Sequence, residues 1–143
     1  MPSEHIPIAL RHQVSERAQG LCEYCRCPAH FTNAAFHCEH IQPRNAGGET
    51  ALNNLAWACP CCNAHKYIKT HAFDPQTRRS IPLFNPRCQR WLRHFMWSAD
   101  FMLIVGRTMA GRATVEALHL NRPEQINLRR VLYAAGEHPP HVE

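Results

Sequence analysis

Two C-x-x-C pairs in the sequence have the spacing of zinc ligands. The pairs are Cys22 with Cys25, and Cys59 with Cys62. One C-x-x-C turn presents two thiolates to a single ion, and two such turns complete the tetrahedral coordination of structural zinc. We therefore predict a four-cysteine zinc site, which leaves no open position for a substrate. Cys27 and Cys61 lie beside the pairs, and either could replace a predicted ligand.

The segment that the pairs enclose contains the residue types that hydrolytic enzymes use. In chain order it includes Glu39-His40, Pro43-Arg44, Gly47-Gly48, Asn53-Asn54-Leu55 and Cys62-Asn63-Ala64-His65-Lys66. Each element alone is common, because an acid–His pair is usually a surface pair and Gly-Gly is usually a plain loop. The order of the elements carries the information, since chance rarely supplies all of them in sequence.

This order resembles the HNH nuclease family, in its form with zinc knuckles on either side of the catalytic segment. The resemblance extends from about Leu10 to Lys69 and implies a ββα-metal unit, in which two strands, an irregular loop and a helix hold one divalent cation. It implies that His40 is the general base and that Asn54 orients it. It also implies that Glu39 and Asn63 bind the catalytic cation, in an H-N-N variant with Glu in place of the usual Asp.

The chemistry of these residue types agrees with phosphodiester hydrolysis. A neutral imidazole can accept a proton from water near neutral pH. One carboxylate and one amide oxygen are hard donors, which suit Mg²⁺ or Mn²⁺ better than a second zinc. Lys66 follows Asn63 by one turn on the same helix face, so we expect Lys66 to meet a phosphate, with Arg44 as a weaker candidate. The family implies products with 5′-phosphate and 3′-hydroxyl ends.

The leading functional hypothesis is a metal-dependent DNA endonuclease with His40 as general base. The alternative is a non-catalytic, zinc-stabilised nucleic-acid-binding module, which would not need a base beside a cation site. A structural zinc protein that binds another protein is a third possibility, but it leaves the basic charge of the chain unexplained. The residue pattern favours neither single- nor double-stranded DNA, no particular DNA sequence and no particular biological pathway. It also leaves the oligomeric state open.

Composition and charge are compatible with a DNA partner. The chain has 143 residues, 45% of them hydrophobic, and a net charge of +5. Between Lys66 and Arg112 lie nine Lys or Arg residues and two acids, together with most of the aromatic residues. Such a stretch suits a polyanion, although composition alone slightly favours a solvated basic face over an aromatic core. Four arginines could line a DNA path or merely be solvated: Arg107, Arg112, Arg129 and Arg130.

The longest unbroken apolar run, Phe101 to Val105, is too short to span a membrane. Charged residues near the start, such as Glu4 and Arg11, disfavour a signal peptide. We therefore expect a cytoplasmic protein without membrane contact or a small-molecule cofactor. Clustered cysteines in a reducing compartment hold metal more often than they form disulfides.

The elements that position these residues form an α+β fold. Sequence patterns predict a helix over Ile8–Ala18, a strand over Ala34–Ile41, an apolar segment over Leu52–Ala58 and a helix over Asn63–Lys69. Asp74-Pro75 and Asn85-Pro86 predict a linker.

The second half resembles, more loosely, an extension of some bacterial HNH proteins. It predicts a hairpin of 95–98 and 101–107, then helices over about 111–120 and from Pro123 to near Gly136. The expected architecture is a ββα-metal core in residues 1–72, braced by the four-cysteine zinc site, and a β-hairpin plus two-helix extension in 73–143 that packs on the same single domain.

Overall fold

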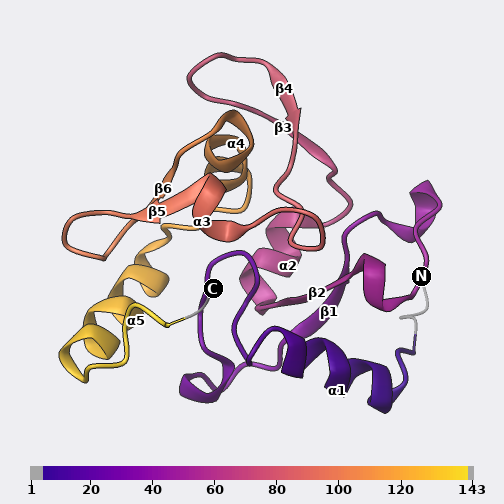
Figure 1. The fold of residues 1–143 in the computed structure, drawn as a ribbon, viewed down its shortest axis with the longest axis horizontal. Coiled ribbons are helices and arrows are strands. Elements are labelled where there is room, and N and C mark those ends of the chain that lie inside the picture. The colour runs from indigo at the N-terminus through magenta and orange to yellow at the C-terminus, as the bar shows by residue number, and fades with distance from the viewer. Residues whose placement is uncertain (1–4, 142–143) are drawn as a thin grey trace.

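A computed structural model describes residues 5–141, and its centre is a hairpin followed by a short helix (Figure 1). Strands β1 (His37–His40) and β2 (Leu55–Ala58) pair antiparallel, and His40 lies opposite Leu55. Helix α2 (Pro60–Lys66) follows β2 directly. These three elements form the predicted ββα unit, and the α+β fold class is confirmed.

Helix α2 begins three residues earlier than the sequence predicts. Cys59 caps it, because the Cys59 sulfur accepts a hydrogen bond from the backbone N–H of Cys62 at 3.4 Å. Pro60 occupies the first helical turn, where its missing N–H costs nothing. The helix ends at Lys66, because Tyr67 adopts a positive φ of 48°. The second cysteine pair therefore belongs to the first turn of the helix.

Helix α1 (Ile8–Arg17) packs beside β2, and the first cysteine pair follows it. Arg17, in the last turn of α1, donates hydrogen bonds to the carbonyl oxygens of Leu52 and Leu55. Short 3-10 turns occur at Ala29–Phe31, Arg44–Ala46 and Leu52–Asn54. The last two belong to the irregular loop that joins β1 to β2.

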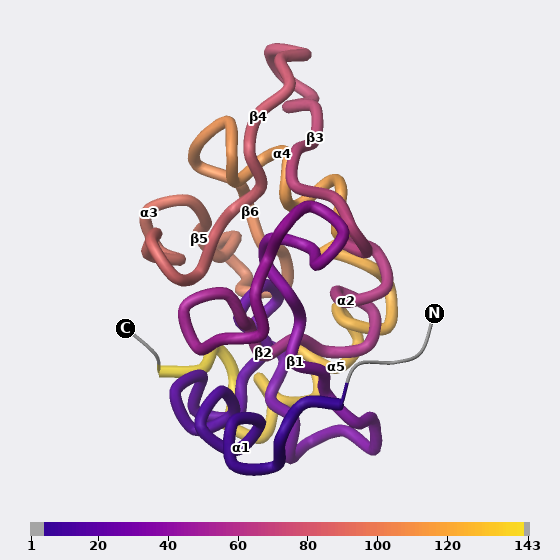
Figure 2. Tube along the Cα trace, turned by 90° about the vertical axis from the view of Figure 1, so that its right-hand side faces the viewer, coloured from indigo at the N-terminus to yellow at the C-terminus, as the bar shows by residue number. Residues whose placement is uncertain are grey.

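The predicted linker contains a hairpin that sequence analysis missed. Strands β3 (His71–Phe73) and β4 (Ser80–Pro82) pair antiparallel, and their hairpin projects away from β1 and β2 (Figure 2). Asp74 anchors the turn, because its carboxylate oxygens lie 2.9 and 3.0 Å from Nε and Nη2 of Arg112. Side-chain interactions across distant segments thus order a stretch whose prolines indicated only a linker.

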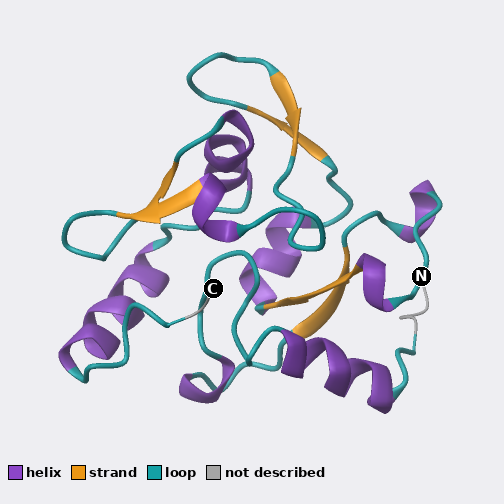
Figure 3. Ribbon diagram, in the orientation of Figure 1, coloured by secondary structure: helices purple, strands orange, loops and turns teal. Residues whose placement is uncertain are grey.

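The second half contains the predicted hairpin and two helices, with one additional short helix, α3 (Trp91–His94) (Figure 3). The remaining elements are β5 (Phe95–Trp97), β6 (Ile104–Gly106), α4 (Met109–Ala117) and α5 (Pro123–Ala134). Both strands of the hairpin are shorter than predicted, because residues 98–103 form the turn.

One buried cluster joins the two halves of the chain. Val14 and Trp57 from the first half belong to the same cluster as Phe84, Trp91 and Leu118 from the second. The expected boundary after residue 72 falls inside β3. Among the described residues, no helix is long and apolar enough to cross a membrane.

Candidate active site and metal centre

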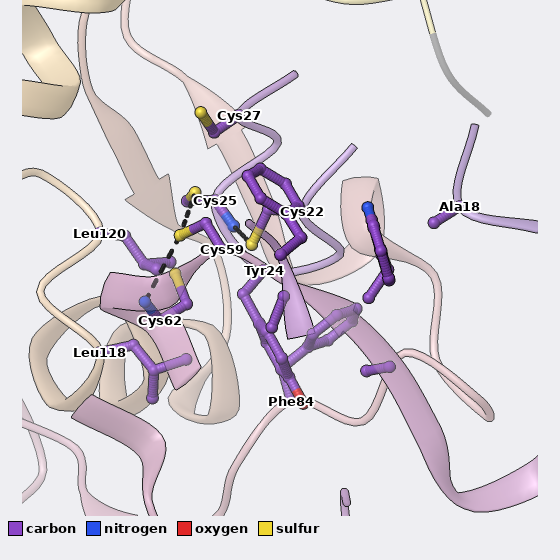
Figure 4. Close-up of a cluster of buried hydrophobic side chains, with 14 of the residues drawn as sticks. Ala18, Cys22, Tyr24, Cys25, Cys27, Cys59, Cys62, Phe84, Leu118 and Leu120 are labelled. Atoms are coloured by element: carbon purple, nitrogen blue, oxygen red, sulfur yellow. Dashed lines mark hydrogen bonds between the residues drawn. The ribbon is translucent and has the colours of Figure 1, made fainter. Parts of the chain in front are cut away.

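The four predicted zinc ligands converge in the structure. Their sulfur atoms all lie within 4.8 Å of one another, and all four residues are buried: Cys22, Cys25, Cys59 and Cys62. Tetrahedral zinc with bonds of ~2.3 Å requires sulfurs ~3.8 Å apart, and the sulfurs of Cys25 and Cys59 are 3.7 Å apart. Figure 4 shows the Cys27 sulfur away from this group, and Cys61 is exposed. The donor set therefore fits a structural zinc ion without Cys27 or Cys61.

Both cysteine pairs have the local geometry of a zinc knuckle. The backbone N–H of Cys25 lies 3.5 Å from the Cys22 sulfur, as that of Cys62 lies 3.4 Å from the Cys59 sulfur. Such N–H···S contacts help to stabilise negative charge on the thiolates. A zinc ion bound there would tie the segment after α1 to the start of α2.

Arg122 lies beside the sulfur cluster, and sequence analysis missed this contact. Its Nη2 lies 3.3 Å from the Cys59 sulfur and 4.0 Å from the Cys25 sulfur. Four thiolates and one Zn²⁺ sum to a charge of −2, which an adjacent guanidinium partly offsets. Arg122 comes from the start of α5, so no local sequence signal connects it with the cysteines.

His40 ends β1 and is half-buried. Its Nε2 lies 2.8 Å from the hydroxyl oxygen of Thr50, and Arg44 Nη1 lies 3.1 Å from the same oxygen. Burial, and then the positive charge of Lys66, lower the pKa of His40 below its ordinary value of 6.5. Both effects favour the neutral form of the imidazole. Thr50 connects the predicted base to the predicted phosphate contact Arg44, a role that its position in the sequence does not indicate.

Asn54 braces the irregular loop that follows His40. Its side-chain oxygen accepts from Gln42 N–H at 2.8 Å, and its amide nitrogen donates to the carbonyl oxygens of Gln42 and Glu49. Because Thr50 follows Glu49, these hydrogen bonds connect Asn54 to His40 through the loop. Gly48 is required there, since a Cβ would lie 1.8 Å from the Gln42 carbonyl oxygen.

Glu39 and Lys66 form an ion pair inside the protein. Glu39 is 3% exposed and Lys66 1%, and the Lys66 ammonium lies 2.5 Å from Oε1 of Glu39. The Tyr24 hydroxyl donates to the other carboxylate oxygen at 2.7 Å. Lys66 also donates to the carbonyl oxygens of His40 and Ile41. The structure thus turns Lys66 inward, instead of toward a phosphate as its spacing from Asn63 led us to expect.

The donors that the family resemblance assigns to a divalent cation are only partly available. Asn63 is half-buried on α2, three residues before Lys66. A carboxylate and an amide oxygen are donors of the right kind for Mg²⁺ or Mn²⁺. However, the charge of Glu39 is already balanced by the Lys66 ammonium. A cation at Glu39 therefore has to share the carboxylate with Lys66 or displace it.

The structure changes the roles of two arginines from the second half. Arg129 is 2% exposed and donates to the carbonyl oxygens of Met102 and Leu120. It therefore stabilises the fold and cannot line a DNA path. Arg112 is held by Asp74, so part of its charge is already neutralised.

Comparison with known proteins agrees with the resemblance. Residues 22–68 match the family model of the HNH endonucleases, which confirms the family for this segment. Over 119 residues, the chain is 26% identical to the Septu protein PtuB of Bacillus thuringiensis, and the alignment covers 82% of this chain. The aligned part is 43% of the relative, so the chain spans less than half of its length. No solved structure matches the chain.

Proposed function

We propose that this chain, with its HNH endonuclease segment at residues 22–68, is a metal-dependent DNA endonuclease in which His40 is the general base. The observation that carries the proposal is the half-buried imidazole of His40, held by Thr50 at the end of β1 within a ββα unit. Its lowered pKa favours the neutral form that a base requires. A base of this kind takes a proton from the attacking water and contributes typically ~10²–10⁴ in rate.

The residues around His40 have distinct tasks in this proposal. Thr50 holds the imidazole by a contact of 2.8 Å, and Asn54 fixes the loop that carries Thr50. Arg44 is exposed and adjacent, so it is the residue that we assign to a DNA phosphate. Lys66 is assigned to positioning, because its ammonium holds the carbonyl oxygens of His40 and Ile41 from behind.

Glu39 and Asn63 are the residues that we assign to a divalent cation, Mg²⁺ or Mn²⁺. Such a cation would neutralise charge on the phosphate and on the departing 3′-oxygen. The buried contact between Glu39 and Lys66 predicts that this cation binds weakly, since it competes with an ammonium that is already in place. Millimolar rather than micromolar concentrations are therefore expected to be needed.

The test is cleavage of supercoiled plasmid DNA by the purified zinc-containing protein, with and without Mg²⁺ or Mn²⁺. The expected result is nicking or linearisation that depends on the added cation and is lost in His40→Ala. His37→Ala is the matched control, because His37 lies on the same strand but is exposed at its other end. Absence of cutting by the wild-type chain with either cation, or full cutting by His40→Ala, would refute the proposal.

A second candidate is the non-catalytic nucleic-acid-binding module. The observation that favours it is the Glu39–Lys66 ion pair, which occupies the carboxylate of the cation site. The same plasmid assay separates the two functions when it is paired with a gel-shift measurement. A binding module retards DNA equally with His40 or Ala at position 40 and leaves the DNA intact in every cation.

A further inference from the structure

A basic cavity lies outside the candidate active site, where the two halves of the chain meet. Its volume is about 800 Å³, within the range of pockets that hold small organic ligands. The lining comes from the end of α1, the first cysteine knuckle and the segment from Phe84 to Arg93. Neither the HNH family match nor the proposed catalytic residues account for this cavity.

Four guanidinium groups line the cavity: Arg17, Arg26, Arg90 and Arg93. Within residues 5–141, none of them forms a salt bridge with a carboxylate. One carboxylate, that of Glu23, also lines the cavity, but it is bound by Arg87 and by the backbone N–H of Trp57. Glu23 also interacts electrostatically with Arg17 and Arg26, so one carboxylate opposes four guanidinium groups. The remaining excess of positive charge in a concave site favours an anionic ligand.

Two of the arginines are held in place before any ligand arrives. Arg17 is fixed by the carbonyl oxygens of Leu52 and Leu55 at 2.8 and 2.7 Å. The Arg26 guanidinium lies over the Trp91 ring, 5.1 Å from its centroid. A guanidinium held against an indole presents a flat face on which a base can stack. Preorganised groups of this kind bind with a smaller loss of side-chain entropy.

The cavity also has an apolar and amide-bearing part. Phe84, Trp91 and Leu92 line it, beside the side chain of Gln89. Gln89 accepts a hydrogen bond from Asn85 N–H at 2.8 Å, which orients its amide. A ligand that satisfies both parts has several negative charges and a flat apolar portion. Inorganic anions lack the flat apolar portion, and apolar ligands lack the negative charges.

We propose that this cavity binds a nucleotide through its phosphate groups, with the base against the Arg26 and aromatic side. A free nucleoside triphosphate and the 5′-phosphorylated end of a DNA strand share this chemistry. A DNA strand end has a structural basis as the ligand. Arg17 donates a hydrogen bond to the carbonyl oxygen of Leu55, and Leu55 lies opposite His40 in the β1–β2 hairpin. The inference goes beyond the proposed function and does not rest on it, since binding in the cavity needs no hydrolysis.

The test measures binding to the full chain carrying His40→Ala, in buffer without divalent cations, so that no cleavage can occur. The probes are ATP, inorganic triphosphate, and one oligonucleotide with either a 5′-phosphate or a 5′-hydroxyl. Calorimetry gives the affinities for the free ligands, and fluorescence anisotropy gives those for the labelled oligonucleotides. The discriminating variant is Arg90→Ala/Arg93→Ala, whose side chains are exposed and whose loss should not disturb folding.

The matched control is Arg78→Ala/Arg79→Ala, which removes the same charge from the exposed turn between β3 and β4. We expect the cavity variant to weaken binding by about tenfold for each guanidinium lost. The control variant should change the binding affinity by less than about twofold, because salt screens charges that act only at long range. We also expect ATP to bind about tenfold more tightly than triphosphate, since one stacked base contributes ~1–3 kcal/mol, at 1.4 kcal/mol for each tenfold.

Tight binding of ATP that depends on Arg90 and Arg93 supports the proposal with a free nucleotide as ligand. Binding of the oligonucleotide that depends on its 5′-phosphate and on the same arginines supports it with a strand end. The proposal is overturned if neither probe binds saturably, if both double variants lose affinity equally, or if triphosphate binds as tightly as ATP. Plasmid cleavage by the wild-type chain is scored separately, so failure here does not imply failure of the nuclease proposal.

Discussion

Replacement of Lys66 by Met tests whether this lysine stabilises the fold or contacts DNA. The side chains of Lys66 and Glu39 are 2% and 3% exposed and 2.5 Å apart. Met fills a similar volume but leaves the Glu39 carboxylate without its cation. Breaking a buried ion pair by removing one partner costs ~3–5 kcal/mol, because an uncompensated charge remains inside. At this chain length, we expect the melting temperature to fall by roughly 6–20 °C.

The loss of stability in Lys66→Met should depend on pH in a defined direction. Burial raises the pKa of Glu39 above its ordinary value, although the Lys66 ammonium and the Tyr24 hydroxyl lower it. Without Lys66, the pKa of Glu39 rises further. A carboxyl group with a raised pKa in the folded state binds a proton more readily there than in the unfolded chain. Stability is therefore regained as the pH falls through the pKa of Glu39, and the deficit of the variant shrinks in that direction.

Urea unfolding in the presence of excess zinc measures this effect, with Lys69→Met as the control. Lys69 is exposed, so its replacement should change the free energy of unfolding by less than about 0.5 kcal/mol. Glu39→Gln/Lys66→Met should recover most of the loss, because it leaves no buried charge while Tyr24 can still donate to the amide oxygen. An unchanged urea midpoint in Lys66→Met, together with weakened DNA binding, would contradict this reasoning and favour a phosphate contact.

Four further outcomes are expected. The acid limb of the pH–rate profile of DNA cleavage should lie at lower pH than for an ordinary imidazole, because burial and the charge of Lys66 lower the pKa of His40. Thr50→Val should lower the cleavage rate by about two- to tenfold, because one hydrogen bond to His40 is lost, and it should leave the zinc content unchanged. Thr50→Ser keeps the hydroxyl and should retain the wild-type rate. Arg122→Gln should weaken zinc binding by roughly 10–100-fold in a chelator competition, because it removes the guanidinium beside the sulfurs. Gly48→Ala should reduce both thermal stability and cleavage, since its Cβ would collide with the Gln42 carbonyl oxygen.

The sequence determined the parts of this protein whose geometry is local. A C-x-x-C spacing by itself brings two sulfurs to one side of a turn, and the N–H···S contacts of both pairs have that local origin. The order of acid–His, loop, Asn and helix implied the ββα unit through its resemblance to the HNH family. The unit forms from segments that are close in the chain, because β1 pairs with β2 and α2 follows β2 directly. The glycine pair was correctly placed in a loop, though the sequence did not reveal the close approach that requires Gly48.

Only the tertiary structure decided which way the charged residues face. The spacing of Asn63 and Lys66 puts them on one side of α2, but the docking of α2 against β1 decides that Lys66 meets Glu39. Arg122 reaches the sulfurs from the start of α5, and Asp74 orders the β3–β4 hairpin through Arg112 of α4. The basic cavity combines α1, the first knuckle and the segment around α3. Local periodicity carries no information on such contacts, because burial and ion pairing depend on how distant elements pack.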